Sequence, residues 1–200
     1  LTNLTEAWSV EQFITTMQTD KPRREELIGQ LQTIVSRNVP PLDTCVLSIT
    51  QIHAGTAYNV VPETAKLCGT IRYFKDDIYE TARARMEALC KGLAEAYGVE
   101  IKLDARNVFD VLINDPELSD AYLEAAADIV GAENVSSEAA PATGSEDFAD
   151  MLKIVPGSYC RLGHTGTIGL HNPAFVLGQE ILPIGASIMA RVVERRLSLN

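Results

Sequence analysis

The stretch from Gly144 to Gly185, GSEDFADMLKIVPGSYCRLGHTGTIGLHNPAFVLGQEILPIG, gathers polar residues able to carry chemistry among glycines and prolines. Loops that hold such residues between rigid elements are common places for binding and catalytic sites. The Leu-His-Asn-Pro run at 170–173 predicts a fixed turn that holds the His171 ring outward. A lone histidine is more often a surface or hydrogen-bonded residue than a ligand, so the surrounding motifs decide its interpretation.

Composition and charge describe an ordinary globular chain of 200 residues, with 46% hydrophobic and 22% charged residues. This length allows one domain or two small ones. The net charge of −10 argues against a nucleic-acid or anionic-membrane partner, because both require clustered Lys and Arg. No apolar run approaches the roughly 18 residues of a membrane span, and the N-terminus lacks the apolar core of a signal peptide. We therefore expect a cytoplasmic protein.

The four cysteines, Cys45, Cys68, Cys90 and Cys160, are widely spaced and contain no C-x-x-C pair. This spacing excludes zinc-finger and dithiol redox motifs. Because Cys45, Cys68 and Cys90 lie in apolar runs, we interpret them as buried free thiols of a protein in a reducing compartment.

The first 29 residues predict a helical leader. Their apolar residues approximate one face of a helix, which Thr5 or Ser9 could cap. These apolar residues are Trp8, Val10, Phe13, Ile14 and Met17. A second helix is expected from near Pro22 to Arg37, before Pro40-Pro41.

Residues 30–110 predict a small α–β sandwich. Three stretches predict strands: the first alternates and is rich in β-branched residues, the second reads as the next strand, and the third alternates apolar with polar residues. Asp76-Asp77 is expected to cap a long helix, with Glu80 as the capping-box partner of Asp77, and Gly98 is expected to end it. The expected strands are 44–53, 66–74 and 99–108. An antiparallel sheet with two helices on one face follows, and its edge would suit pairing with a second copy.

Asn114-Asp115-Pro116 is a turn signal that marks the expected boundary of a second domain, residues 111–200. Asp115 is expected to cap the first helix of this domain, with Pro116 in its first turn. The expected elements are a helix over 116–130, a short strand near Val135, a helix over 145–152, a strand over 158–162 and a helix over 182–197.

Several motifs in one order resemble the metal-dependent amidohydrolases and metallopeptidases that include hippurate hydrolase, aminoacylase and carboxypeptidase G-like enzymes. They are SITQIHAGTAYNVVP at 48–62, GTIR at 69–72, and then GSEDFADML, VPG, LHNP and LPIG. The resemblance covers roughly residues 30–196 and leaves 1–29 without a family match. It implies that 30–110 is the family's lid, which commonly dimerises. Residues 111–200 would then be the C-terminal part of its α/β catalytic domain.

The resemblance also assigns the candidate site residues. It implies that His171 is a metal ligand, with Glu146, Asp147 and Glu180 as partners that orient the ligands. Helix capping is an equally good explanation of Glu146 and Asp147. An imidazole at position 171 would help complete a two-metal site, of zinc or manganese, that activates water against an amide carbonyl.

A second set of candidates would bind the substrate. The resemblance implies that Asn59 holds the substrate near its carboxylate, often in the site of a partner subunit. Arg72 could bind the same carboxylate through both guanidinium nitrogens, or it could form a structural ion pair. His53 could donate a hydrogen bond to the substrate, although a satisfied structural role is the more common one for such a residue.

The departure from the family concerns the metal ligands. The chain has three histidines, His53, His164 and His171, and a catalytic zinc site needs about three protein ligands. We therefore expect no complete catalytic set, and no metal retained by this chain alone. Hydrolysis of N-acyl amino acids or related amides would need a missing portion. The competing hypothesis is a non-catalytic dimerisation or ligand-binding module. If a portion is missing, the C-terminal part should expose apolar surface.

Overall fold

The computed structural model describes residues 2–3, 6–7, 9–18, 24–142, 144–170 and 172–197, with the backbone alone before residue 25. The chain forms two compact units. The first, here called the sheet unit, contains residues 7–112 and 143–149. The second, the C-terminal unit, contains residues 1–6, 113–142 and 150–200.

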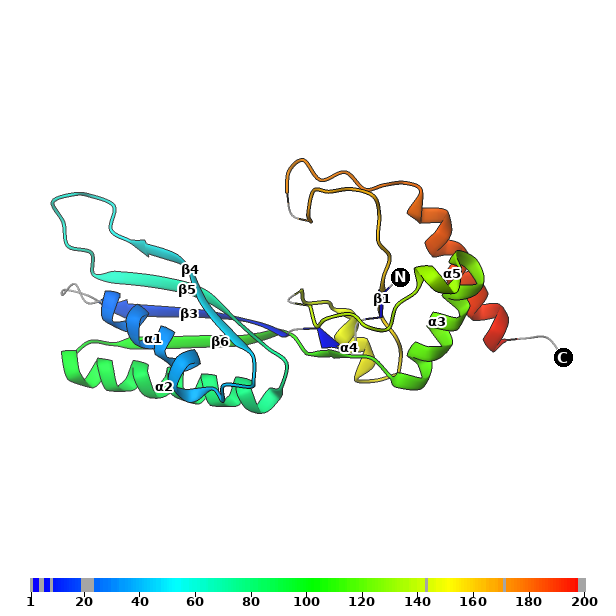
Figure 1. The fold of residues 1–200 in the computed structure, drawn as a ribbon. Helices are drawn as coiled ribbons and strands as arrows, with labels where there is room; N and C mark the ends of the chain where they lie inside the picture. The colour runs from blue at the N-terminus through cyan, green and yellow to red at the C-terminus, as the bar shows by residue number, and fades with distance from the viewer. Residues whose placement is uncertain are drawn as a thin grey trace. The chain divides into compact units, whose positions relative to one another are not determined.

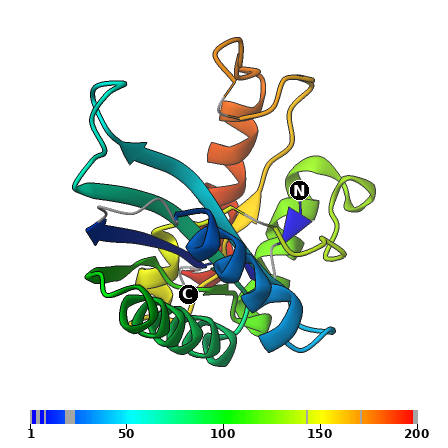
Figure 2. The same ribbon diagram turned by 90° about the vertical axis from the view of Figure 1, so that its left-hand side faces the viewer.

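An antiparallel four-stranded sheet organises the sheet unit, with the order β4-β5-β3-β6 (Figures 1 and 2). Its strands are β3 (Ser9–Gln18), β4 (Cys45–Ala54), β5 (Thr64–Tyr73) and β6 (Ile101–Phe109). β3 pairs with β5 along its whole length, from Ser9 opposite Tyr73 to Gln18 opposite Thr64. Its other edge pairs with β6. The fold class expected from the sequence is therefore confirmed, with one more strand than expected.

The expected helix over Trp8 to Met17 is wrong, because Ser9–Gln18 is the strand β3. The run SVEQFITTMQ contains apolar residues at spacings compatible with a helix, but it is also rich in Val, Ile and Thr. Such residues favour strands when neighbouring strands are available for pairing. β3 has a strand on each side, so pairing with segments distant in sequence decides its conformation.

Two helices, α1 (Arg24–Asn38) and α2 (Asp76–Tyr97), cover one face of the sheet (Figures 1 and 2). β5 alternates between the two faces, so that its odd-numbered residues from 65 to 73 are buried beneath the helices. The core that results is continuous across the helices and the strands. Its fully buried side chains include Leu27, Leu31, Ile34, Leu67, Ile71, Tyr73 and Met86.

The ends of α2 follow the sequence signals only in part. Gly98 closes the helix in the left-handed conformation, with φ 64°, as expected for a glycine stop. At the other end Lys75 occupies the N-cap position without a capping side-chain hydrogen bond, so the expected cap at Asp76-Asp77 does not form there. The Asp77 carboxylate instead accepts a hydrogen bond from the Ile78 N–H at 2.9 Å.

The C-terminal unit is built around two helices, α3 and α5, which pack on each other. The Asp115 carboxylate caps α3 by accepting a hydrogen bond from the Leu118 N–H, as the sequence predicts. Near Val135, where a short strand was expected, the 3-10 turn η1 is followed by an extended Val135 and a single β-bridge at Ser136. The elements outside the large sheet are β1 (Thr2–Asn3), β2 (Glu6–Ala7), β7 (Leu112–Ile113), α3 (Pro116–Val130), η1 (Ala132–Asn134), α4 (Phe148–Leu152), β8 (Cys160–Arg161) and α5 (Ile181–Arg196). β1 pairs with β8, and β2 with β7.

Burial differs sharply between the two units. The large core cluster lies in the sheet unit, whereas the fully buried residues of α3 and α5 are Ala125, Ala126 and Ile188. The C-terminal unit exposes many large apolar side chains, as expected for this part of the chain. They include Ile129, Met151, Ile154, Val155, Leu170, Val176, Leu182, Met189 and Val193. None of the described helices is long and apolar enough to cross a bilayer.

Candidate functional site

His53 lies on the sheet face that the helices leave uncovered. A bulge in β4 between Ile49 and Gln51 shifts the register, so that Gln51 and His53 oppose Cys68 and Lys66. Before the bulge the odd-numbered residues of β4 point into the core, and after it they point away from the core. The His53 Nε2 atom is hydrogen-bonded to the Gln51 Oε1 atom at 3.1 Å. The ring is exposed and has a local partner.

Arg72 also belongs to the uncovered face, but it lies near the other end of β5. It is half-buried and opposes Val46 in β4. His53 opposes Lys66, which is six positions from Arg72 in β5. At about 3.4 Å per residue, this separates the His53 and Arg72 positions by roughly 20 Å along the strand. Within one copy the structure therefore does not bring these two substrate-binding candidates together.

Asn59 lies in the exposed loop that connects β4 to β5, at the same end of the sheet as His53. Gly55 begins this loop with φ 71°, a conformation that residues with a Cβ rarely adopt. The neighbouring side chains of Tyr58, Val60 and Val61 are fully or largely exposed. The loop thus presents an amide beside apolar groups, which is a surface suited to contact another molecule.

The acidic candidates Glu146 and Asp147 lie outside any regular helix. α4 begins at Phe148 instead of Ser145, so Glu146 and Asp147 precede its first turn. Glu146 is half-buried and Asp147 is exposed. The Glu146 carbonyl accepts a hydrogen bond from the Ala149 N–H at 3.2 Å.

Glu180 stands directly before α5 and is exposed. Its carboxylate accepts a hydrogen bond from the Thr165 hydroxyl at 3.0 Å. Hydrogen bonds from its own backbone N–H and from Thr165 lower the pKa of the Glu180 carboxyl below its ordinary value. These contacts tie the glycine-rich loop to the start of α5, and they keep the carboxylate ionised.

His171 lies outside the described residues, but the turn that follows it is described. The Asn172 side-chain oxygen accepts a hydrogen bond from the Ala174 N–H at 2.9 Å, and the Asn172 carbonyl accepts one from the Phe175 N–H at 2.9 Å. These bonds form a turn over residues 172–175, and the expected turn over 170–173 stays a prediction because it includes His171. The His164 ring in the same loop packs edge-on against Phe175.

The described residues do not fit a catalytic metal. Among residues 25–142, 144–170 and 172–197, no group of three or more His, Cys, Asp or Glu side chains could hold an ion. A catalytic zinc site uses about three protein ligands and keeps one position for water. The part of the chain that is described therefore supplies too few donors for such a site.

The structure also contains a cavity that the sequence motifs do not indicate. It has a volume of about 680 Å³ and lies in the C-terminal unit, between α3, α5 and residues 156–158. Its lining residues are spread over three segments and form no motif. Only the apolar faces of the two predicted helices could have pointed to it.

An antiparallel sheet covered by two helices, with the Ser-Glu-Asp-Phe and Leu-His-Asn-Pro motifs after it in the sequence, agrees with the amidohydrolase and metallopeptidase family that these motifs resemble. The chain belongs to peptidase family M20/M25/M40, whose model matches residues 7–195. The match begins inside the segment 1–29, for which the sequence motifs indicated no family resemblance.

Curated relatives agree with this assignment. The chain is 34% identical to the N-acetylcysteine deacetylase of Bacillus subtilis over 167 residues, which are 84% of this chain and 43% of the relative. It is 32% identical to the hippurate hydrolase of Campylobacter jejuni over 171 residues, 86% of this chain and 45% of that enzyme. The chain therefore spans less than half the length of these relatives.

A solved structure shares the fold. It is a dinuclear metal binding peptidase of the M20 family from Bacillus subtilis, which superposes with a TM-score of 0.71 and 26% identity. The superposition covers 98% of this chain and 51% of the other. Both units of the present chain therefore have counterparts in that peptidase.

Proposed function

We propose that the chain supplies the lid and the C-terminal catalytic portion of a zinc- or manganese-dependent amidohydrolase. The substrates would be N-acyl amino acids or related amides, as the names of a hippurate hydrolase and an N-acetylcysteine deacetylase among its relatives suggest. The observation that carries the proposal is the family match over residues 7–195.

Asn59 and His53 are the proposed contacts to the substrate. Both lie at the end of the sheet where β4 meets its connecting loop, and both are exposed. A neutral amide and an imidazole can each donate a hydrogen bond to a carboxylate or a carbonyl oxygen. Their exposure supports a role in a site completed by another part of the molecule or by a partner subunit.

Of the two roles considered for Arg72, substrate binding and a structural ion pair, the structural role fits its surroundings better. It is half-buried, lies roughly 20 Å along the strand from the His53 position, and already interacts with another group of the protein. One substrate carboxylate cannot reach both ends of β5. We therefore assign substrate contact to Asn59 and His53, and we propose that Arg72 stabilises the sheet.

The proposed metal site needs donors beyond the described residues. His171 would be one ligand, with Glu146, Asp147 and Glu180 as orienting groups, but amide hydrolysis with paired metals requires several more. The chain alone is therefore expected to be inactive. Its coverage of 43–45% of the two curated relatives supports this.

Metal analysis and an activity assay test this proposal. The purified chain is dialysed against zinc or manganese, its metal content is measured by inductively coupled plasma mass spectrometry, and hydrolysis of hippurate and N-acetylcysteine is followed. We expect substoichiometric metal and no hydrolysis. Stoichiometric metal, or turnover that a chelator abolishes, would overturn the proposed inactivity but leave the amidohydrolase class intact.

A cytoplasmic homodimer is the proposed state of the protein, formed through the sheet unit. β4 and β6 are the edges of the sheet and are free to pair in the described structure. The sheet unit also has its own large core, which favours the alternative of a non-catalytic dimerisation or ligand-binding module. Sedimentation equilibrium that finds only monomer would exclude the dimer and the dimerisation module, but not a ligand-binding module.

A further inference from the structure

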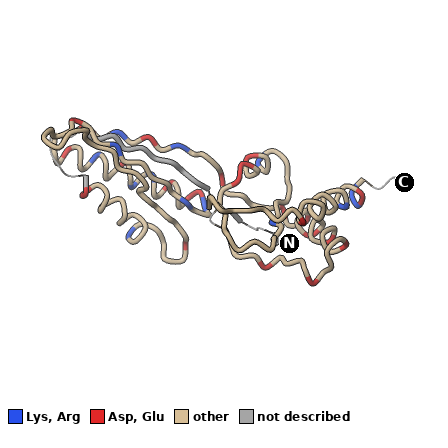
Figure 3. Tube along the Cα trace, turned by 90° about the horizontal axis from the view of Figure 1, so that it is seen from above, with Lys and Arg blue, Asp and Glu red and all other residues tan. Residues whose placement is uncertain are grey.

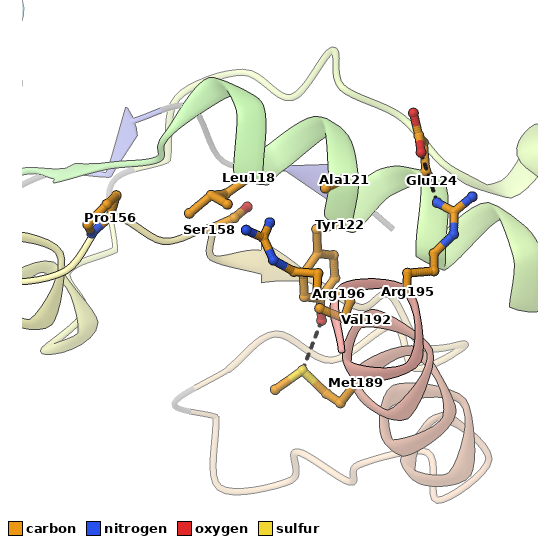
Figure 4. Close-up of a pocket in the computed structure, with 10 residues that line it drawn as sticks. All are labelled: Leu118, Ala121, Tyr122, Glu124, Pro156, Ser158, Met189, Val192, Arg195 and Arg196. Atoms are coloured by element: carbon orange, nitrogen blue, oxygen red, sulfur yellow. Dashed lines mark hydrogen bonds and ion pairs between the residues drawn. The ribbon is translucent and has the colours of Figure 1, made fainter. Parts of the chain in front are cut away.

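The cavity between α3 and α5 combines apolar walls with a charged rim. Leu118 and Ala121 of α3 and Val192 of α5 contribute the walls, and Pro156 closes one side (Figure 4). Its volume of about 680 Å³ lies within the range of cavities that bind small organic molecules. All lining residues belong to the C-terminal unit, so the cavity is defined by this unit alone.

Tyr122 forms a fixed wall of the cavity. Its hydroxyl donates a hydrogen bond to the Met189 Sδ atom at 3.4 Å across the space between α3 and α5. Burial, together with a hydrogen bond to Cys160, raises the pKa of the Tyr122 phenol. The ring therefore stays neutral and contributes apolar surface without adding negative charge beside the cavity.

The two arginines at the rim differ in their partners. Arg195 contacts the Glu124 carboxylate at 2.9 Å and the Asp128 carboxylate at 3.3 Å, so its charge is compensated. Arg196 makes no ion pair with any described residue of the chain. Figure 4 shows its guanidinium extended over the cavity, on the side of Ser158. One cation without an ion-pair partner among the described residues thus lies at the mouth of a largely apolar cavity.

The other two arginines of α5 near Arg196 contact acidic residues. Along α3 and α5 basic and acidic residues lie side by side (Figure 3), and both Arg191 and Arg195 contact Asp128. A cation in the last turn of a helix is favourable in itself, because it opposes the helix dipole. That effect applies to Arg195 and Arg196 alike, although both line the cavity and only Arg195 has an ion pair among the described residues.

We propose that this cavity binds a small apolar carboxylate. The carboxylate would pair with the Arg196 guanidinium, which can bind both of its oxygens, and the apolar part would lie against Leu118, Ala121 and Val192. A simple fatty acid and an N-acyl amino acid share this chemistry. The lining residues of this site belong to the C-terminal unit, whereas the proposed substrate contacts Asn59 and His53 belong to the sheet unit.

Calorimetric titration of the whole chain tests the proposal. The probes are octanoate and hippurate, which represent the two sources of such a carboxylate, with octylammonium as the control of opposite charge. We expect octanoate, hippurate or both to bind and octylammonium not to bind. Arg196→Gln should weaken binding about tenfold or more, the loss typical of a charge-assisted pair. Arg37→Gln, which changes another arginine in the last turn of a helix, should leave binding unchanged.

Two further results would locate the ligand. Amide chemical shifts of Ala121 and Val192 should move on titration, and Val192→Phe, which fills the cavity, should abolish binding while circular dichroism shows a folded chain. Absence of binding by both acids, equal binding of octylammonium, or full affinity in Arg196→Gln would overturn the proposal. Shifts confined to the sheet unit would overturn it as well.

Discussion

Asn114 and Tyr159 are joined by a pair of hydrogen bonds. The Asn114 side-chain amide donates to the Tyr159 carbonyl at 2.7 Å, and the Tyr159 N–H donates to the Asn114 side-chain oxygen at 2.8 Å. Asn114 is only 7% exposed. The Asp115 N–H adds a bond to the Gly157 carbonyl at 2.9 Å. Together these contacts attach the segment before β8 to the start of α3.

Asn114→Ala should destabilise the C-terminal unit by about 2–4 kcal/mol. The change removes two hydrogen bonds and leaves a backbone N–H and a backbone carbonyl of Tyr159 without these partners in a partly buried place. Chemical denaturation followed by hydrogen exchange of amides in α3 measures the loss. Asn134→Ala is the matched control, because its amide makes an exposed bond to Val130 and should cost about 1 kcal/mol or less.

Two glycines of the same helical region should respond in opposite directions. Gly98→Ala is expected to destabilise the sheet unit by about 1 kcal/mol, because the residue at the end of α2 is held at φ 64°. Gly92→Ala should stabilise it by about 0.5–1 kcal/mol, because Gly92 lies inside α2 with no atom within 4 Å of the added Cβ position. Thermal unfolding of the two variants measures both changes. Equal effects would contradict the role of Gly98 as the helix stop.

The contribution of Asp128 to stability should depend on pH. The hydrogen bond from Arg191 and the charge of Arg195 lower the pKa of the Asp128 carboxyl below its ordinary value of 3.8. Its stabilising effect is therefore complete above pH 3.8 and is lost as the pH falls through the lower pKa of the folded state. Asp128→Asn should lower Tm slightly at pH 7 and leave it unchanged at the acid end.

Asp120→Asn is the control for this pH series, since Asp120 is exposed on the same helix and makes no ion pair with any described residue. Its Tm should follow that of the parent chain at every pH. Added salt should reduce the effect of Asp128→Asn at pH 7, because the pair with Arg191 is exposed and screened. A Tm difference that persists at low pH would point to packing instead of charge.

The cysteines should differ widely in reactivity toward a thiol reagent. Burial raises the pKa of Cys45 and of Cys90 to about 11 from an ordinary 9.0. At pH 8 this leaves about a hundredfold less thiolate than an ordinary cysteine has. In the folded chain we expect fast labelling of the half-buried Cys68 and labelling of Cys45 and Cys90 only on unfolding. Cys68→Ser should remove the fast phase.

Local signals predicted most of the fold. The cap at Asp115, the stop at Gly98 and the β-branched run of β4 each act over a few residues, and the structure confirms them. β3 was assigned to a helix, because its pattern fits both periods and its strand conformation depends on pairing with β5 and β6. Pairing between segments that are distant in sequence cannot be recognised from a local pattern.

The candidate site was predictable only as a set of residues. Motifs pointed to Asn59, His53 and Arg72, but they could not show that one bulge in β4 turns His53 outward, or that Arg72 lies near the opposite end of β5. The cavity beside Arg196 was not predictable, because its residues meet only when α3 and α5 pack together. The position of a side chain in the fold depends on strand register and packing, whereas its residue type can be read from the sequence.

The central position of β3 constrains synthesis on the ribosome. β3 ends at residue 18, yet its two neighbours end at residues 73 and 109. The strand must therefore leave the ribosome well before either partner exists, and the sheet closes only after β6 has emerged. During that interval both edges of β3 are open to other nascent chains. Slow translation of residues 19–109 would lengthen this exposure, and a chaperone that shields extended segments would shorten it.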